Sequence, residues 1–435
     1  MKIAIVHPSL AARGGSQRYV IEIARTLKEM GMDIDIYCYE YNPNICYPDL
    51  VSELNIFNLK TLESSSSPFI KCKKKSPIKK LFKELKKYKP INKIIYSLGI
   101  DCLYSFYIVQ KQAKDFSCFI KKKQINYDII YAHEEPLSVW AAIHYKKKSG
   151  VPIYWFCYDT IEKWFLEWNK EHKNSRLRQV ILKNIFFKYD KFKIRKYVDL
   201  SSVLDKKMEQ KFTNLYDINP LIRRGGISNN VLKYKNKNFL RKKYNLPDDK
   251  IILFCLSRFL PYKRIHDIFE FYRDLPDEIN KKIFIYINAP ITDMHYYEDC
   301  KIKYKDVFKA KNIVIDLEFP INDEHMYNLY LSSDIFLFPN ENQTWGHAPL
   351  EAMACGTSVV ISNGCGIHEI IKKITPHTIF NTGDINQMSR IIEQLIENNN
   401  FKTTAVKQKK YVEQNLTWHK ICAKFLLDFQ NILEK

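Results

Sequence analysis

The chain has 435 residues, of which 46% are hydrophobic and 27% are charged; this composition is that of a folded globular protein and excludes a largely disordered one. Its length exceeds one ordinary domain core and fits two domains of common size. The formal net charge of +21 favours polyanionic partners, which include nucleic acid, anionic lipid headgroups and phosphorylated small molecules.

The cysteines and the N-terminus indicate in which cellular compartment the protein is located. The 11 cysteines are scattered without the spacing of a zinc site, which is typical of a reducing environment. The first apolar run ends at His7 and Pro8, too early for a signal peptide, and no segment reaches the roughly 20 apolar residues that span a bilayer. We expect a cytoplasmic protein that is free or lies peripherally on the inner face of the membrane.

The first half has the pattern of a parallel α/β sheet. A strand at 2–7 is followed by a Gly-containing loop, a helix from Gln17 with apolar residues at helical spacing, and an alternating strand at 34–38. Further buried strands are predicted at 128–132 and 152–157. This order predicts a Rossmann-like domain over residues 1–218.

The pattern starts again in the second half and predicts another Rossmann-like domain over residues 219–416. The predicted strands are 251–256, 282–288, 313–315, 335–338 and 358–361, and the clearest helices are 266–275 and 324–331. Residues 417–435 form an amphipathic pattern, and we expect this helix to cross back and pack on the first domain.

The most specific motif follows the predicted strand 335–338. It runs from Gln343 through Gly346 and His347 to Glu351 and Gly356. Gly346 allows a close backbone approach to a ligand, and the N–H groups at the helix start suit a diphosphate. Glu351, one turn into the helix, can accept hydrogen bonds from a ribose diol. The alternative is that Glu351 only favours the helix dipole.

Two cations follow the predicted strand 251–256, where ligands bind open α/β sheets. Arg258 and Lys263 at this position can neutralise a diphosphate leaving group without a metal ion. Gly15 opens the first helix after the first strand and is a weaker anion-binding signal of the same kind. His133 follows the strand 128–132 and can hydrogen-bond a sugar or share a proton, although a lone histidine is more often structural.

Together these segments resemble the family-4 retaining glycosyltransferases of GT-B fold. The resemblance rests on Gly14-Gly15, His133-Glu134, Arg258 with Lys263, the segment from Gly346 to Gly356, and Asn381-Thr-Gly-Asp384, and it spans nearly the whole chain. It implies two Rossmann-like domains with a cleft between them, with the acceptor side in residues 1–218 and the nucleotide-sugar donor side in residues 219–416. It also implies that the cationic pair binds the donor diphosphate, that Glu351 binds the ribose and that His133 contacts the donor sugar.

The resemblance therefore predicts a hexosyltransferase-type enzyme that moves a sugar, with retention, from a UDP- or GDP-sugar to a glycan or polyprenyl-linked lipid acceptor. Such an enzyme serves the assembly of cell-surface polysaccharide, glycolipid or glycoprotein glycans. The catalytic candidates are His133, Gln343, Arg258 and Lys263; the donor-binding candidates are Gly15, Arg258, Lys263, Gly346, His347 and Glu351. No metal or other cofactor is expected, because the only DxD-like run, Asp33 to Asp35, lies inside a predicted strand.

One position departs from the family pattern. Gln343 stands where the first Glu of an E-x7-E pair is expected. An amide can hydrogen-bond sugar hydroxyls but has no charge to stabilise a developing oxocarbenium ion.

Two other functions fit parts of the sequence. A nucleotide-sugar epimerase of the same fold would need acid and base carboxylates around the sugar, and Gln343 argues against that. A nucleic-acid-binding protein would fit the net charge of +21, but the chain has no recognisable nucleic-acid-binding motif, so we expect no nucleic acid partner.

Two basic amphipathic stretches, 71–93 and 181–196, lie in the first half. Helices of this kind bind anionic bilayers, with each basic residue near the surface contributing about 1 kcal/mol. A solvated helix face packed on the domain explains the same pattern equally well. An anionic membrane surface is therefore an expected partner, with the solvated face as its alternative.

Overall fold

The computed structural model describes residues 1–60, 100–134, 136–160, 180, 182–228, 231, 234–318 and 322–434. The basic stretch 71–93 lies outside these residues. The chain divides into two compact units. Unit 1 contains Met1–Arg223 and Cys422–Lys435, and unit 2 contains Arg224–Ile421. Each unit has its own parallel sheet, so the predicted pair of Rossmann-like domains is confirmed.

The sheet of unit 1, in the described part of the chain, has the strand order β3-β2-β1-β4-β5-β6-β7 with parallel pairing. Its central strands are apolar and buried because helices cover both faces. The strands are β1 (Lys2–Leu10), β2 (Asp33–Tyr41), β3 (Asn55–Lys60), β4 (Ile129–His133), β5 (Ile153–Phe156), β6 (Leu200–Val203) and β7 (Leu221–Ile222).

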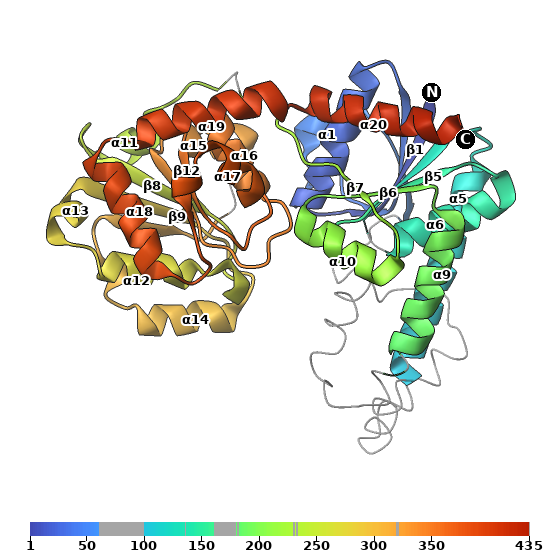
Figure 1. Ribbon diagram of the computed structural model, residues 1–435, viewed down its shortest axis with the longest axis horizontal. Coiled ribbons are helices and arrows are strands. Elements are labelled where there is room, and N and C mark those ends of the chain that lie inside the picture. Colours follow the sequence, from blue (N-terminus) through green and yellow to red (C-terminus); the bar gives the residue numbers. More distant parts are fainter. Residues whose placement is uncertain are drawn as a thin grey trace. The chain divides into compact units, whose positions relative to one another are not determined.

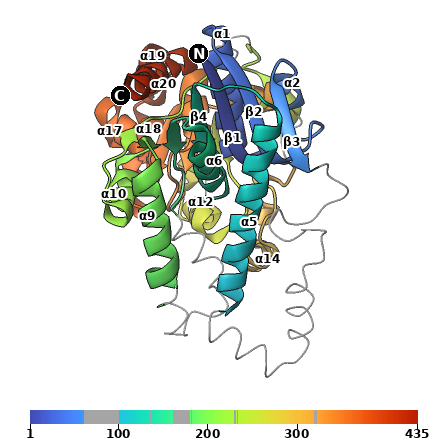
Figure 2. The ribbon, with the colours of Figure 1, turned by 90° about the vertical axis from the view of Figure 1, so that its right-hand side faces the viewer.

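Figures 1 and 2 show α1 and α20 on one face of this sheet and α5, α6 and α9 on the other. The aromatic rings of Phe425 and Phe429 on α20 pack on Tyr131 and Tyr154 of the sheet. The helices are α1 (Gly15–Glu29), α2 (Pro48–Val51), α5 (Ile100–Lys122), α6 (Pro136–Ser149), the π-helix η1 (Leu182–Phe187), α9 (Lys188–Tyr197), α10 (Lys206–Tyr216) and α20 (Trp418–Leu433).

The sheet of unit 2 has the strand order β10-β9-β8-β11-β12-β13, again parallel in the residues described. Isoleucines, leucines and phenylalanines of its central strands form the core together with the flanking helices. The strands are β8 (Ile251–Leu256), β9 (Ile283–Asn288), β10 (Ile313–Asp316), β11 (Ile335–Phe338), β12 (Ser358–Ser362) and β13 (Ile379–Phe380).

In unit 2, α15, α16 and α19 lie on one side of the sheet, and α12, α14 and α18 lie on the other (Figure 1). The helices are α11 (Phe239–Tyr244), η3 (Pro261–Lys263), α12 (Ile265–Arg273), α13 (Asp277–Lys282), α14 (Met294–Lys303), η4 (Val307–Lys309), α15 (Asp323–Leu331), α16 (His347–Cys355), α17 (His368–Ile374), η5 (Pro376–Thr378), α18 (Ile385–Glu397) and α19 (Phe401–Asn415). Among the helices described in both units, none is long and apolar enough to cross a membrane.

The first strand is longer than its sequence pattern predicts. The predicted strand ends at His7, whereas β1 continues to Leu10 and pairs Ser9 with Glu40 and Leu10 with Tyr41 of β2. Pro8 removes only one N–H from the ladder, so the strand continues past it. At β4 the prediction differs by one residue, because His133 is the last residue of the strand and not the first after it.

Candidate functional site

The strand order of unit 2 locates its ligand-binding edge. β8 and β11 are neighbours in the sheet; from β8 the chain goes on to β9 and β10, and from β11 it goes on to β12 and β13 on the opposite side. Ligands bind open α/β sheets at such a switch point, outside the carboxyl ends of the strands. The loops after β8 and β11 contain four of the site residues predicted from the sequence, namely Arg258, Lys263, Gln343 and Gly346.

The structure brings two of these residues into contact. Nζ of Lys263, at the end of η3, donates a hydrogen bond to Oε1 of Gln343 in the loop after β11. The backbone joins the same two loops, because N of Glu341 donates to the carbonyl oxygen of Tyr262 at 2.8 Å. Arg258 lies on the loop after β8 and is exposed. Lys263 and Gln343 thus form a polar centre at the switch point.

The backbone around Gln343 is paired with the loop after β12. N of Gln343 donates to the oxygen of Gly364 at 3.1 Å, and N of Gly366 donates to the oxygen of Gln343 at 2.8 Å. Gly346 has a φ of +105°, and a Cβ there would lie 2.7 Å from Sγ of Cys365. Only glycine fits both the backbone angle and the contact. These contacts hold the motif loop against the loop after β12.

The helix that follows this loop has an N-terminus that is suited to bind an anion. α16 begins at His347, and Gly346 before it offers no side chain to cap the first turn. The N–H groups of a first helical turn have no partner within the helix and attract negative charge. Glu351 is 6% exposed, and the hydroxyl of Tyr330 donates to its Oε2 at 3.1 Å. Binding of a diphosphate and of a ribose at these residues remains a prediction.

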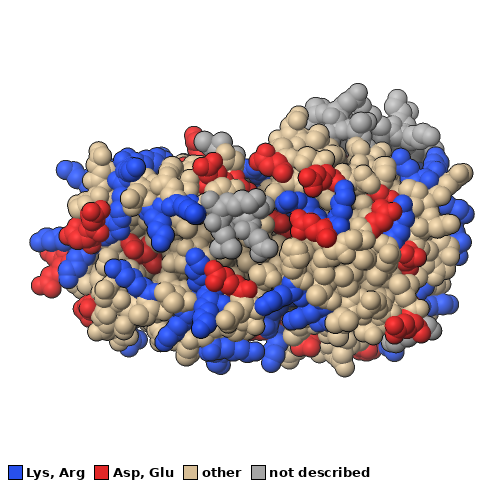
Figure 3. Space-filling view, turned by 90° about the horizontal axis from the view of Figure 1, so that it is seen from above, with Lys and Arg blue, Asp and Glu red and all other residues tan. Residues whose placement is uncertain are grey.

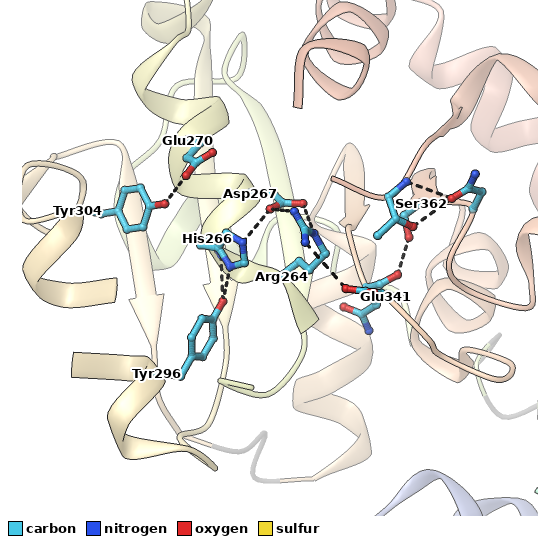
Figure 4. A network of polar contacts seen from close by, with 11 residues as sticks. Arg264, His266, Asp267, Glu270, Tyr296, Tyr304, Glu341 and Ser362 are labelled. Carbon is cyan, nitrogen blue, oxygen red and sulfur yellow. Dashed lines mark hydrogen bonds and ion pairs between the residues drawn. The ribbon is translucent and has the colours of Figure 1, made fainter. Parts of the chain in front are cut away.

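A salt-bridge network next to Lys263 was not identified from the sequence. Arg264 donates to both carboxylate oxygens of Asp267, at 2.7 and 2.9 Å, and lies 3.9 Å from Oε2 of Glu341 (Figure 4). Burial raises the pKa of Asp267. A Cβ on Gly383 would come within 3.0 Å of Nη2 of Arg264. This network stabilises the loop that contains Lys263. The sequence signal that could have predicted the Arg264–Asp267 ion pair is the spacing of an Arg and an Asp three residues apart.

The start of unit 2 packs against the motif loop through glycine. A Cβ on Gly225 would lie 2.7 Å from Nε1 of Trp345, whose side chain is 1% exposed. Arg224 lies over the Trp345 ring, 5.8 Å from its centroid, and pairs with Glu369 at 2.7 Å. Glycine at position 225 is thus required by its close approach to Trp345, which lies between Gln343 and Gly346.

The remaining predicted residues belong to unit 1, which has its own switch point between β1 and β4. Gly15 is the first residue of α1, after β1, and His133 ends β4. The imidazole of His133 is fully buried, 5.4 Å between ring centroids from His7. Burial and the neighbouring His7 hold the pKa of His133 far below its ordinary value, so the ring is neutral.

Comparison with known proteins identifies a family for part of the chain. Residues 236–414 match the family model described as Glycosyl transferases group 1. The chain is 23% identical to an uncharacterized glycosyltransferase of Methanocaldococcus jannaschii, over 74% of this chain and 79% of that protein.

Two curated relatives with stated activities match over shorter lengths. N-acetyl-alpha-D-glucosaminyl L-malate synthase of Bacillus anthracis is 24% identical over 36% of this chain and 39% of its own. Serotype-specific mannosyltransferase WbdA of Escherichia coli is 25% identical over 37% of this chain and 19% of its own. The match thus spans well under half the length of both proteins.

Solved structures share the whole fold. Anabaena Alr3699/HepE in complex with UDP and glucose has a TM-score of 0.66 and 13% identity, over 99% of this chain and 100% of that one. Sucrose-phosphate synthase from Thermosynechococcus elongatus has a TM-score of 0.70 and 15% identity, over 100% and 99%. At such identities the likeness establishes the architecture alone, which is the GT-B fold.

Proposed function

We propose, since residues 236–414 match the family model of glycosyl transferases group 1, that the chain is a retaining hexosyltransferase that uses a UDP- or GDP-sugar. The observation that carries this proposal is the contact of Lys263 with Gln343 at the switch point of unit 2, beside the exposed Arg258 and the start of α16. These groups supply positive charge and hydrogen-bond donors where a diphosphate is expected. The acceptor class is a glycan or a lipid-linked sugar.

In the proposed reaction the bond between the anomeric carbon and the diphosphate oxygen breaks, and a bond from that carbon to an acceptor oxygen forms on the same face. The proton of the acceptor hydroxyl passes to the departing diphosphate. Arg258 and Lys263 neutralise the charge that develops on the diphosphate, with the N–H groups at the start of α16. Glu351 holds the ribose, while Gln343 and His133 contact the sugar. In this scheme the two cations neutralise the diphosphate leaving group, so no metal ion is needed for that role.

A donor-binding experiment tests the proposal. Purified protein is heated with UDP-, GDP- and ADP-sugars, and a donor at about 100 times its dissociation constant adds about 2.7 kcal/mol of stability. Lys263→Gln removes one charged contact, which corresponds to a 10- to 100-fold weaker donor affinity. Lys305→Gln is the matched control, since Lys305 is exposed between α14 and η4, before the amino end of β10. A protein that neither binds, hydrolyses nor transfers from any donor would refute the proposal.

We also propose that α9 rests on an anionic membrane surface that carries a lipid-linked acceptor. Phe192 of α9 is 56% exposed, while Asp190 and Ile194, two positions before and after it, are the buried residues of this helix. At 100° per residue, Phe192 therefore points directly away from the core. The residues that line the surface hollow around it are otherwise basic, namely Lys188, Lys191, Arg195 and Lys196.

The neighbouring helices extend the positive field. α5, α6 and α9 lie side by side in Figure 2. The pKa of His144 on α6 is lowered by burial and by the positive charges of Lys147, Lys193, Lys114 and Lys148. On the faces of the two units seen in Figure 3, by contrast, Lys and Arg alternate with Asp and Glu. An exposed aromatic side chain within a basic surface suits a bilayer of anionic lipid.

Vesicle sedimentation tests this second proposal. We expect binding to vesicles of phosphatidylcholine and phosphatidylglycerol in equal amounts, and weaker binding to phosphatidylcholine alone. Phe192→Ser should reduce binding at least about tenfold, since burying an aromatic side chain contributes about 1.5 kcal/mol or more. Leu427→Ser on α20 is the control, because Leu427 is 60% exposed on another surface of unit 1. Equal binding by both variants would contradict the proposal.

A further inference from the structure

Unit 1 has a carboxylate at its own switch point that the proposed donor site leaves unused. β1 and β4 are neighbours there, and the chain leaves them toward opposite edges of the sheet. Ligands are expected outside the carboxyl ends of these two strands. Glu134 directly follows β4, and His7 lies on β1 near its carboxyl end.

The backbone of Glu134 is strained and firmly held. Its φ is +76°, in the left-handed region that a residue other than glycine rarely adopts. Its N donates to the oxygen of Phe156 at 2.9 Å, and Nε1 of Trp155 donates to its carbonyl oxygen at 2.9 Å. These bonds from β5 hold the strained conformation. The carboxylate is thereby kept at the sheet edge with 19% of the side chain exposed.

His7 holds one oxygen of this carboxylate. The N–H of Ser9 donates to Nδ1 of His7 at 3.2 Å, so Nδ1 has no proton and the ring proton is on Nε2. Nε2 lies 3.0 Å from Oε2 of Glu134, an ion-pair distance, although the approach is not that of a well-aligned hydrogen bond. Among the described residues Oε1 of Glu134 has no partner. One carboxylate oxygen is held and the other is available.

Buried polar groups without partners lie beside this pair. Both ring nitrogens of His133 and the hydroxyl of Tyr131 have no hydrogen-bond partner within the described part of the chain. The two rings are 5.4 Å apart, and His133 lies equally close to His7. Buried polar groups are normally satisfied, so such a group calls for a missing partner. His133 and Tyr131 are themselves fully buried, so the partly exposed carboxylate of Glu134 is the group of this cluster that can accept a hydrogen bond from the hydroxyl of a sugar.

We propose that Glu134, positioned by His7, binds the hydroxyl of the acceptor that receives the sugar. The inference rests on the proposed function, because it assigns the acceptor subsite of the same reaction. Oε1 accepts the hydrogen bond of the attacking hydroxyl, and the ligand class is a sugar or another polyol. His7 acts through Glu134 and is a positioning residue.

The test compares acceptor and donor kinetics with octyl α-D-mannopyranoside and octyl β-D-glucopyranoside as acceptor probes. The donor is the nucleotide sugar that most stabilises the protein. Glu134→Gln should raise the KM for the acceptor about 10- to 100-fold, the effect of losing a hydrogen bond to a charged group, with donor affinity unchanged. His7→Leu should do the same, whereas His7→Gln, which keeps an N–H donor, should recover part of the loss.

Glu53→Gln makes the same change at an exposed glutamate of unit 1 and should leave both affinities unchanged. The inference is overturned if Glu134→Gln keeps the wild-type acceptor KM, or if donor affinity falls with it. It is also overturned if the wild-type protein binds a donor but neither transfers to nor is stabilised by either glycoside. If no donor binds, the proposed transferase activity fails, while stabilisation of the wild type but not of Glu134→Gln by a glycoside would still support the subsite.

Discussion

Removing the charge of Asp428 should destabilise unit 1 strongly. Arg223, just after β7, donates from Nε and Nη2 to the two carboxylate oxygens of Asp428 on α20, at 2.6 and 2.5 Å. The hydroxyl of Tyr154 donates to the same carboxylate at 3.2 Å. Asp428 is 3% exposed and the Arg223 side chain 18%, so water has little access to the pair. The pair ties the last helix to the sheet of unit 1.

The size of the effect follows from burial. Breaking a buried ion pair on one side costs about 3–5 kcal/mol, because the remaining charge stays buried without its partner. Asp428→Asn keeps one oxygen acceptor for Arg223, so we expect the lower end, about 3 kcal/mol. Replacing both partners with apolar residues, as in Asp428→Leu with Arg223→Met, should recover much of the loss, since no charge is then left buried.

Hydrogen exchange read by mass spectrometry isolates this effect, because peptides of β4 and β5 report the opening of unit 1 alone. The control is Asp217→Asn, the same change at a pair formed with Lys191 at 2.6 Å and Arg195 at 3.1 Å. Asp217 is 54% exposed and has a left-handed backbone that asparagine tolerates, so little change is expected. The reasoning is refuted if Asp428→Asn costs no more than Asp217→Asn, or if the double replacement costs more than Asp428→Asn.

Three further predictions concern the site and the core. Gly346→Ala should lower the free energy of unfolding, measured in urea, by about 1–3 kcal/mol or more and should weaken donor binding. Gly150→Ala is the control: its φ is +79°, but no atom lies within 4 Å of the added Cβ, so it should show the cost of backbone strain alone. Burial raises the pKa of Asp190 from 3.8 to about 6, so the folded state prefers its protonated form. Between pH 4 and pH 6 the free energy of unfolding should therefore fall by about 2 kcal/mol relative to Asp190→Asn; parallel pH profiles would contradict this. Gln343→Glu should raise turnover at saturating donor about tenfold by restoring a negative charge near the anomeric carbon, and a lower turnover would argue against that role.

The local sequence pattern was sufficient to predict many of the strands and loops of unit 2. The strands at 251–256 and 335–338 were predicted to the residue, because each is a short apolar run between polar segments. The loop with Gly346 was identified from its order of strand, loop and helix. That order also located Lys263 and Gln343 at strand ends, and parallel strands that share one edge of a sheet bring such residues together.

By itself the sequence determined the two Rossmann-like domains and the loops that hold the donor candidates, since these depend on periodicity and on residues near one another in the chain. Only the tertiary structure decided which distant side chains meet. His7 reaches Glu134 because β1 and β4 became neighbours, and Arg223 meets Asp428, 205 positions away, because α20 returns to the first sheet. Strand order and helix docking are set by the packing of the whole core, so a local pattern cannot reveal these contacts.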